Sequence, residues 1–137
     1  MQFIDLAAQR ARIGDRIDLA VSKVIREGKY ILGPEVAEFE RKLADYVGVK
    51  HVVACANGTD ALLIPLFAFG VGRGDAVFCP SFTFAATAEV VALAGAEPVF
   101  IDIDPDTYNI DIAQLKAAIK AIRAEGRLTP KAIIPVD

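Results

Sequence analysis

Apolar residues recur at helical spacing in the first third of the chain. From Asp5 to Glu27 they fall near one helical face and the pattern stops at Gly28, which predicts an amphipathic helix with a candidate break at Gly14. A second helix is predicted from Pro34 to Val47, because proline suits a first helical position and Gly48 follows the last apolar residue.

The pattern then changes to short apolar runs that alternate with helix-like stretches. The runs are HVVACA (51–56), AVFCP (76–80), PVFIDI (98–103) and KAIIPV (131–136), and they lack the polar alternation of a half-exposed strand. The helix-like stretches run from Thr59 to Phe69, Phe84 to Ala94 and Ile112 to Glu125. Four such alternations predict the α/β class, with a parallel sheet flanked by helices.

Composition narrows the class of protein. The chain has 137 residues, 54% of them hydrophobic, which suits one domain. Its 15 basic and 18 acidic side chains give no basic excess for nucleic acid or an anionic membrane. The sequence contains neither a membrane-length apolar run nor a signal peptide, so a cytoplasmic protein is expected. Cys55 and Cys79 lie in apolar runs and are predicted to be reduced core residues.

The segment from Asn57 to Thr59 joins a predicted strand to a predicted helix. Gly58 allows a tight turn and close approach of a ligand, and the first helical N–H groups with the Thr59 hydroxyl would bind an anion such as phosphate. The alternative is that Asn57 or Thr59 only caps the helix, while Asp60 complements its dipole.

Two phenylalanines follow the next predicted strand, at the same carboxyl edge of the sheet. One of Phe82 and Phe84 is expected to stack on a flat ligand ring, and the other to pack in the core.

No metal site is predicted. The acidic run Asp102, Asp104 and Asp106 lacks the glycine and the terminal glutamate of a calcium loop, and is interpreted as a turn. His51 has no cluster of ligands at metal spacing and is expected to be a surface or capping residue.

Taken in order, the motifs resemble one family. Over essentially its whole length, the chain resembles the amino-terminal part of the DegT family of pyridoxal-phosphate-dependent sugar aminotransferases. The stretches that carry the resemblance are FIDLAAQ, GKYILGPEVAEFERKLADYVGVKHVVACANGTDAL, GVGRGDAVFCPSFTFAATA and AEPVFIDIDPDTYNID. The resemblance implies the type I aminotransferase fold and a homodimer with shared active sites. It also implies transfer of an amino group, usually from glutamate, to a nucleotide-linked keto sugar.

The resemblance assigns roles to single residues. Gly58 and Thr59, with Asn57 beside them, would hold the cofactor phosphate, and Phe84 would stack on the pyridine ring, which leaves Phe82 for the core. The segment from Tyr30 to Gly33 resembles one that lies near the cofactor or sugar of the neighbouring subunit.

By the same resemblance, the chain is the truncated amino-terminal part of a pyridoxal-phosphate-binding large domain. A helical arm would cover residues 1–33 and an α/β core residues 34–137. The family's Schiff-base lysine and pyridine-nitrogen acid would lie beyond Asp137, which is not that acid. No catalytic residue is therefore assigned, and the fragment is expected to be inactive, with weak or absent cofactor binding.

One alternative belongs to another class of protein. The chain would then be a stand-alone engineered or excised α/β scaffold that folds or self-associates without catalysis. Under either hypothesis a homo-oligomer is expected, because the sheet of the resembling fold would be unfinished and the helix at 61–69 is apolar all round.

Overall fold

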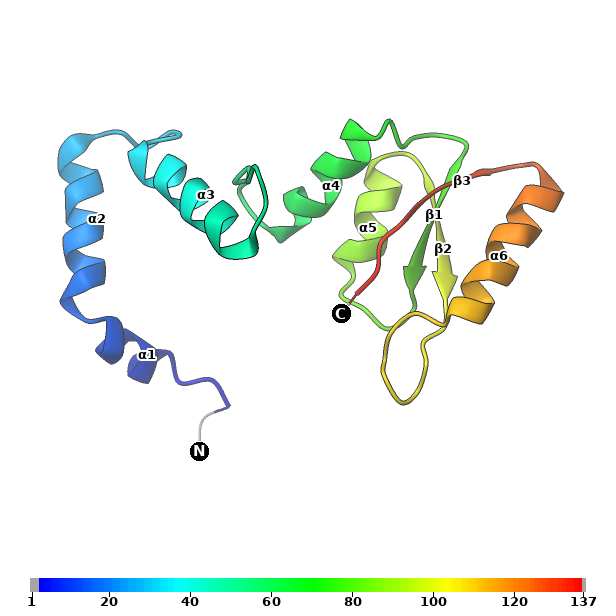
Figure 1. Cartoon of the computed structure of the whole chain (residues 1–137), viewed down its shortest axis with the longest axis horizontal. Helices are drawn as coiled ribbons and strands as arrows, with labels where there is room; N and C mark the ends of the chain where they lie inside the picture. The colour runs from blue at the N-terminus through cyan, green and yellow to red at the C-terminus, as the bar shows by residue number, and fades with distance from the viewer. Residues whose placement is uncertain (1–2, 137) are drawn as a thin grey trace. The chain divides into compact units, whose positions relative to one another are not determined.

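The computed structural model describes residues 3–136, which divide along the chain into two compact units, with the boundary between Ala54 and Cys55. The first unit is helical and the second is an α/β layer structure (Figure 1). The boundary between the compact units falls after residue 54. The expected division into an arm over 1–33 and a core from 34 stays a prediction.

The first unit consists of α1 (Leu6–Ile13), α2 (Asp15–Glu27) and α3 (Pro34–Val47). The predicted break at Gly14 is confirmed, because this residue separates α1 from α2 with a φ of 48°. Gly28 and Gly48 end α2 and α3 in the left-handed conformation, as the sequence predicts. These glycines define the helix ends by local geometry alone.

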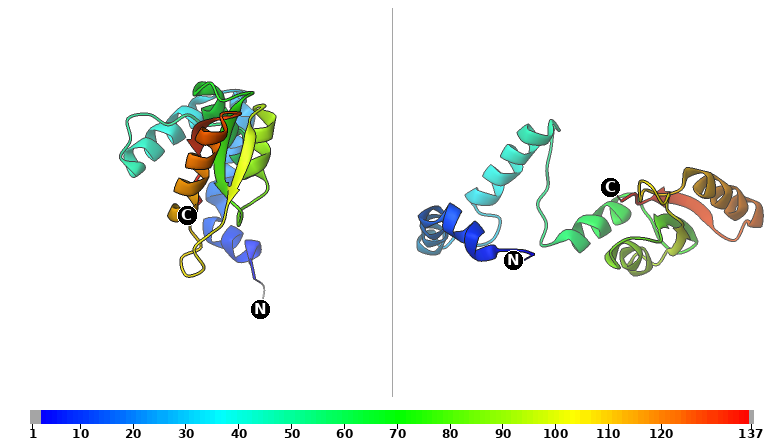
Figure 2. Two further views of the ribbon diagram at one scale, coloured as in Figure 1. Left: turned by 90° about the vertical axis from the view of Figure 1, so that its right-hand side faces the viewer. Right: turned by 90° about the horizontal axis from the view of Figure 1, so that it is seen from below.

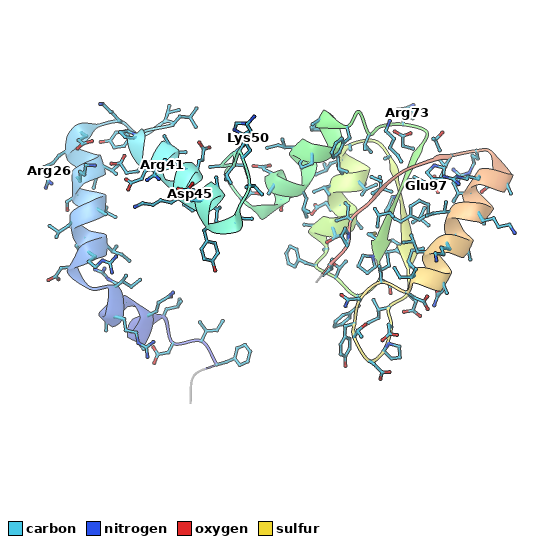
Figure 3. The ribbon with its side chains drawn as sticks, in the orientation of Figure 1. Arg26, Arg41, Asp45, Lys50, Arg73 and Glu97 are labelled. Atoms are coloured by element: carbon cyan, nitrogen blue, oxygen red, sulfur yellow. The ribbon has the colours of Figure 1, made fainter. Side chains whose placement is uncertain are left out.

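The first unit has almost no interior of its own. Among residues 3–54, only Gly33 and Ala44 are buried. Ion pairs such as Arg41 with Asp45, at 3.1 Å on α3, lie on exposed surface (Figure 3). The apolar stripes that predicted these helices therefore lie open to solvent.

The second unit contains a parallel sheet with the strand order β2-β1-β3. Its strands are β1 (Asp75–Pro80), β2 (Glu97–Ile101) and β3 (Thr129–Ile133). In the central strand, Phe78 is in register with Val99 of β2 and Ile133 of β3. The predicted α/β class and parallel sheet are confirmed.

Helices cover both faces of this sheet. The helices are α4 (Gly58–Ala68), α5 (Ala86–Leu93) and α6 (Ile112–Glu125). On one face Val77 packs with Leu66 of α4 and Val90 of α5, and on the other Phe78 packs with Leu115 of α6. Figure 2 shows α5 and α6 on opposite sides of the strands. Successive residues of β1 thus supply two separate cores.

The predicted strand at 51–56 is absent. Residues 51–55 have no regular structure, Val53 is 81% exposed, and the Ala54 N–H donates to Glu40 Oε1 at 2.8 Å. A strand requires a neighbour, and residues 3–136 offer none to this segment. The prediction that both cysteines are buried is consequently wrong for Cys55, which is exposed, and right for Cys79.

Candidate functional site

Asn57 caps the amino end of α4. Its side-chain Oδ1 accepts the Asp60 N–H at 2.9 Å, and its carbonyl accepts the Ala61 N–H at 3.1 Å. Its Nδ2 also donates to the Asp60 carboxylate at 3.1 Å. The capping interpretation of Asn57 is therefore confirmed.

Capping leaves the first two helical N–H groups for a ligand. Gly58 and Thr59 occupy the first positions of α4, where helix geometry provides no carbonyl partner for the N–H. A Cβ placed on Gly58 would meet no heavy atom within 4 Å, so open space lies directly beside this backbone. An anion can approach both N–H groups and the Thr59 hydroxyl while the cap stays in place.

The amino end of α4 is directed toward the carboxyl edge of the sheet. The other end of α4 leads through residues 69–74 into the start of β1, so the helix and strand run in opposite senses (Figure 1). Phe84 follows the end of β1 at Pro80. That Gly58 and Phe84 lie close to each other stays a prediction.

The two predicted roles for the phenylalanines are not divided as expected. Phe84 is 79% exposed, which leaves its ring available for stacking. Phe82 is 64% exposed, so its predicted core position is wrong. Its ring instead lies near that of Tyr108, with 5.7 Å between centroids and 40° between planes. The reason is that β1 ends at Pro80, so Phe82 lies beyond the layers that bury the strand.

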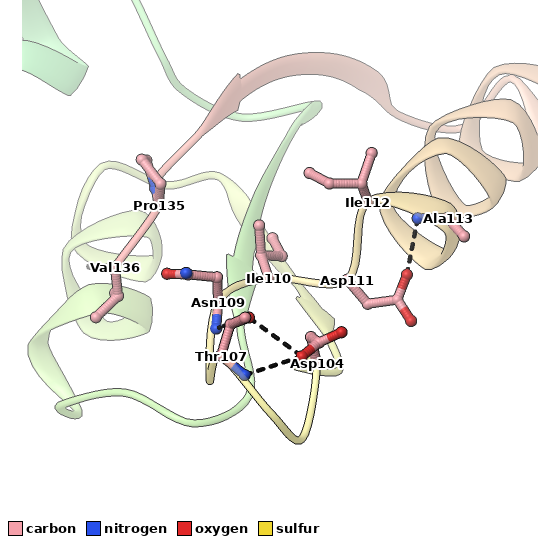
Figure 4. A pocket seen from close by; sticks show the side chains of 9 residues that line it. All are labelled: Asp104, Thr107, Asn109, Ile110, Asp111, Ile112, Ala113, Pro135 and Val136. Atoms are coloured by element: carbon pink, nitrogen blue, oxygen red, sulfur yellow. Dashed lines mark hydrogen bonds between the residues drawn. The ribbon is translucent and has the colours of Figure 1, made fainter.

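The acidic run forms a turn. Asp104 Oδ1 accepts hydrogen bonds from the Asp106 N–H at 2.9 Å, the Thr107 N–H at 2.9 Å and the Thr107 hydroxyl at 3.2 Å (Figure 4). Figure 4 draws the two bonds from Thr107 and not the one from Asp106. These bonds, the one from the Thr107 N–H foremost, hold the pKa of Asp104 below its usual value. Within residues 3–136, no three His, Cys, Asp or Glu side chains gather as metal ligands would.

Two neighbouring cavities lie around this turn. The larger, of about 500 Å³, is bordered by Asp104, Asp111 and Pro135 among others (Figure 4). A second, of about 310 Å³, is lined by Phe82, Phe84 and Tyr108. Sequence analysis missed Tyr108, and only the turn-rich DPDT that precedes it signals a tight loop there.

The other singled-out residues lie elsewhere. In the first unit, the Tyr30 hydroxyl donates to the Ile25 carbonyl at 3.1 Å, and Leu32 has a φ of 47°. His51 is exposed, as expected. Asp137 lies outside the described residues. No helix between residues 3 and 136 is both long and apolar enough to cross a membrane.

Comparison with known proteins gives consistent matches along the chain. The model of the DegT/DnrJ/EryC1/StrS aminotransferase family matches residues 11–137. The UDP-2-acetamido-2-deoxy-3-oxo-D-glucuronate aminotransferase of Pseudomonas aeruginosa is 57% identical over 139 residues, which cover 100% of this chain and 36% of that enzyme.

Solved structures agree in fold. A DegT/DnrJ/EryC1/StrS aminotransferase from Brucella abortus has a TM-score of 0.98 at 72% identity, with 100% of this chain and 37% of that chain covered. NtdA from Bacillus subtilis, with the cofactor PMP bound, has a TM-score of 0.70 at 34% identity, with 84% and 25% covered. The chain thus spans about a third of the length of the Pseudomonas enzyme and of the Brucella protein.

Proposed function

Because the chain belongs to the DegT/DnrJ/EryC1/StrS aminotransferase family, we propose that it is the amino-terminal part of a pyridoxal-phosphate-dependent aminotransferase that moves an amino group from glutamate to a nucleotide-linked keto sugar. The observation that carries the proposal is the 57% identity, along the whole chain, to an enzyme named for a UDP-linked 3-oxo sugar acid. The proposal includes the homodimer that the family resemblance implies and the cytoplasmic location expected from the sequence.

The amino end of α4 fits the phosphate of such a cofactor. Gly58 and Thr59 present N–H groups beside open space, and the Thr59 hydroxyl adds a third donor. The helix dipole favours an anion at this end. In this assignment Asn57 holds the helix start, while Gly58 and Thr59 hold the phosphate.

Phe84 supports the ring of the same cofactor. Its exposed side chain borders a cavity of about 310 Å³. Pyridoxal phosphate, when bound, supplies an electron-withdrawing ring that stabilises negative charge next to the transferred nitrogen. The chain's own contribution is to bind the phosphate and to orient the ring against Phe84.

The isolated chain is expected to bind the cofactor weakly and to leave glutamate unchanged. A helix amino end contributes on the order of 1 kcal/mol per charge interaction. By the family resemblance, the lysine that anchors the cofactor covalently would lie outside this chain. Phosphate and stacking contacts would then act without a covalent bond.

Titration of pyridoxal phosphate into the chain tests the site. Thr59→Val keeps the side-chain shape but removes the hydroxyl, so affinity should fall about two- to tenfold, as expected for one lost hydrogen bond. Thr59→Ser should retain the affinity. Thr129→Val, at the start of β3, is the matched control and should behave as the unchanged chain. Equal affinity for Thr59→Val and the unchanged chain would contradict the site.

Borohydride reduction tests the expected inactivity. After incubation with pyridoxal phosphate, peptide mapping should give scattered, substoichiometric labelling of surface lysines, and glutamate should give no pyridoxamine phosphate above the rate in buffer. Stoichiometric labelling of one lysine with glutamate-dependent turnover would show that the chain is active by itself.

A further inference from the structure

The loop between β2 and α6 is held closed by backbone hydrogen bonds. The Asp111 N–H donates to the Asp102 carbonyl at 2.9 Å, and Ile103 forms an antiparallel bridge with Ile110. Closer to the tip, the Asp104 N–H donates to the Asn109 carbonyl at 2.8 Å. The loop therefore has a defined shape although it lies outside the sheet.

Tyr108 occupies a strained position at the tip of this loop. Its φ is 61°, and among residues 3–136 Leu32 is the only other non-glycine residue with a positive φ. Bulky side chains rarely adopt this conformation, which asparagine tolerates much better. The Tyr108 N–H is fixed by the Asp104 carbonyl at 2.8 Å. Such strain persists only where surrounding contacts impose it, and it is frequent at functional sites.

The strained residue directs its ring to the segment that carries Phe84. Tyr108 pairs with Phe82 at 5.7 Å between ring centroids. Hydrogen bonds also hold the segment on both sides of Phe82. Before it, the Ser81 N–H donates to the Ile101 carbonyl at 2.7 Å. After it, the Thr83 and Thr87 hydroxyls form a hydrogen bond of 2.8 Å. Thr87 is a buried residue of α5, so the Thr83–Thr87 bond holds the segment against this helix.

Tyr108 and Phe84 border the same cavity. This cavity, of about 310 Å³, also includes Phe82 and Thr83 in its lining. A loop that fixes Phe82 from outside the segment will therefore also limit the directions open to Phe84, two residues further on.

We propose that Tyr108 is a positioning residue, whose ring packs on Phe82 and thereby fixes the direction in which Phe84 faces the cavity. The role of Phe84 as the surface for the cofactor ring rests on the proposed function. The effect of Tyr108 on the 81–84 segment does not depend on it.

Amide hydrogen exchange of the free chain tests the effect on the segment. Tyr108→Asn removes the ring but tolerates the positive φ, and Tyr108→Phe keeps the ring. The Ser81 N–H donates to the Ile101 carbonyl and the Thr87 N–H donates to the Phe84 carbonyl, so these two amides report on the segment. Their exchange should become at least about tenfold faster in Tyr108→Asn and stay within about twofold in Tyr108→Phe. Tyr46→Asn, which removes an exposed ring from α3, is the control and should leave this segment unchanged. Unchanged exchange in Tyr108→Asn overturns the proposal.

A second variant covers the case in which Tyr108→Asn loosens the whole unit. The β1 amides serve as the internal reference, since they report the sheet itself. If they also lose protection, the test uses Phe82→Ala instead, which removes the other ring of the Phe82–Tyr108 pair. Faster exchange limited to the Ser81 and Thr87 amides in Phe82→Ala supports the proposal, and unchanged exchange there overturns it.

The circular dichroism of added pyridoxal phosphate tests the consequence for the cofactor. At saturation, Tyr108→Asn should lose more than half of the induced signal and Tyr108→Phe should retain it, while competition by inorganic phosphate stays unchanged in both. A full signal in Tyr108→Asn overturns positioning of the ring. If the unchanged chain gives no signal, the proposed cofactor site fails, and hydrogen exchange still decides the role of Tyr108.

Discussion

Asn57 and Asp60 are joined by two hydrogen bonds at the amino end of α4. The Asp60 N–H donates to Asn57 Oδ1 at 2.9 Å, and Asn57 Nδ2 donates to the Asp60 carboxylate at 3.1 Å. The Asn57 side chain thus caps the helix through the Asp60 N–H and also bonds to the Asp60 side chain. Capping and the proposed anion binding would therefore use different atoms of the same turn.

Replacement of Asn57 by alanine should weaken α4. Loss of the cap is expected to cost about 1 kcal/mol of helix stability, whereas Asn57→Ser should retain most of it. Hydrogen exchange of the α4 amides measures the effect. Equal protection in Asn57→Ala and the unchanged chain would show that the cap contributes nothing.

Gly58→Ala should separate folding from ligand binding. The added methyl group meets no protein atom within 4 Å, so thermal unfolding should be unaffected. The same methyl would occupy the space beside the phosphate, and affinity for pyridoxal phosphate should fall at least about tenfold, or 1.4 kcal/mol. Gly72→Ala, where the added carbon lies 3.8 Å from the Ala94 carbonyl oxygen, is the matched control. Undiminished affinity in Gly58→Ala would argue against the phosphate site.

Gly33→Ala should disturb the start of α3. An added Cβ would lie 2.4 Å from the Lys29 carbonyl oxygen, so the backbone must shift. Overpacking of this kind costs about 1 to 3 kcal/mol. Exchange of the Val36 N–H, which donates to the Gly33 carbonyl at 3.0 Å, should accelerate.

The control for Gly33→Ala is Gly48→Asn. Gly48 has a positive φ but open space around it, and asparagine tolerates that conformation. Its effect should be small. An equally small effect of Gly33→Ala would mean that the turn at 29–33 relaxes without cost.

Asp111 should make the stability of α6 depend on pH. Its Oδ1 accepts the Gln114 N–H at 3.0 Å and the Ala113 N–H at 2.7 Å, and these bonds hold its pKa below the ordinary value of 3.8. Because the pKa is lower in the folded state, the stabilisation is complete above the ordinary value and is lost as the pH falls through the folded one.

Carboxyl-carbon NMR of Asp111 and helical circular dichroism during acid titration measure this effect. Asp111→Asn keeps an acceptor oxygen without titrating, so its helix should depend less on pH. An Asp111 carboxyl that titrates at or above its ordinary value would contradict the prediction.

The chain should associate in a concentration-dependent manner. Within the described residues, β2 and β3 each pair on one side only, and Ile64 and Phe67 of α4 are 51% and 57% exposed. Unpaired edges and exposed apolar surface favour self-association. Light scattering at low micromolar protein should show species larger than a monomer, fewer of them in Phe67→Glu. A monomer at all concentrations would contradict both the expected homo-oligomer and the self-associating scaffold.

The sequence by itself determined the helices, and three of the four predicted strands are present in the described residues. The predicted helix from Ile112 to Glu125 agrees with α6 residue for residue. In the structure Asp111 caps this helix and Gly126 follows it. The predicted bounds of α3 are also those of the structure. These signals are local, because caps, left-handed glycines and periodic apolar faces act within a few residues along the chain.

Only the tertiary structure decided which apolar segments are buried. The run at 51–56 has the composition of a strand but no partner in the described chain, so Cys55 is exposed while Cys79, in the central strand, is buried. The exposure of Phe82 and the left-handed backbone of Tyr108 were equally hidden from the sequence. Strand pairing and ring packing join residues that are far apart along the chain, so the sequence near one residue does not indicate which residue it will contact.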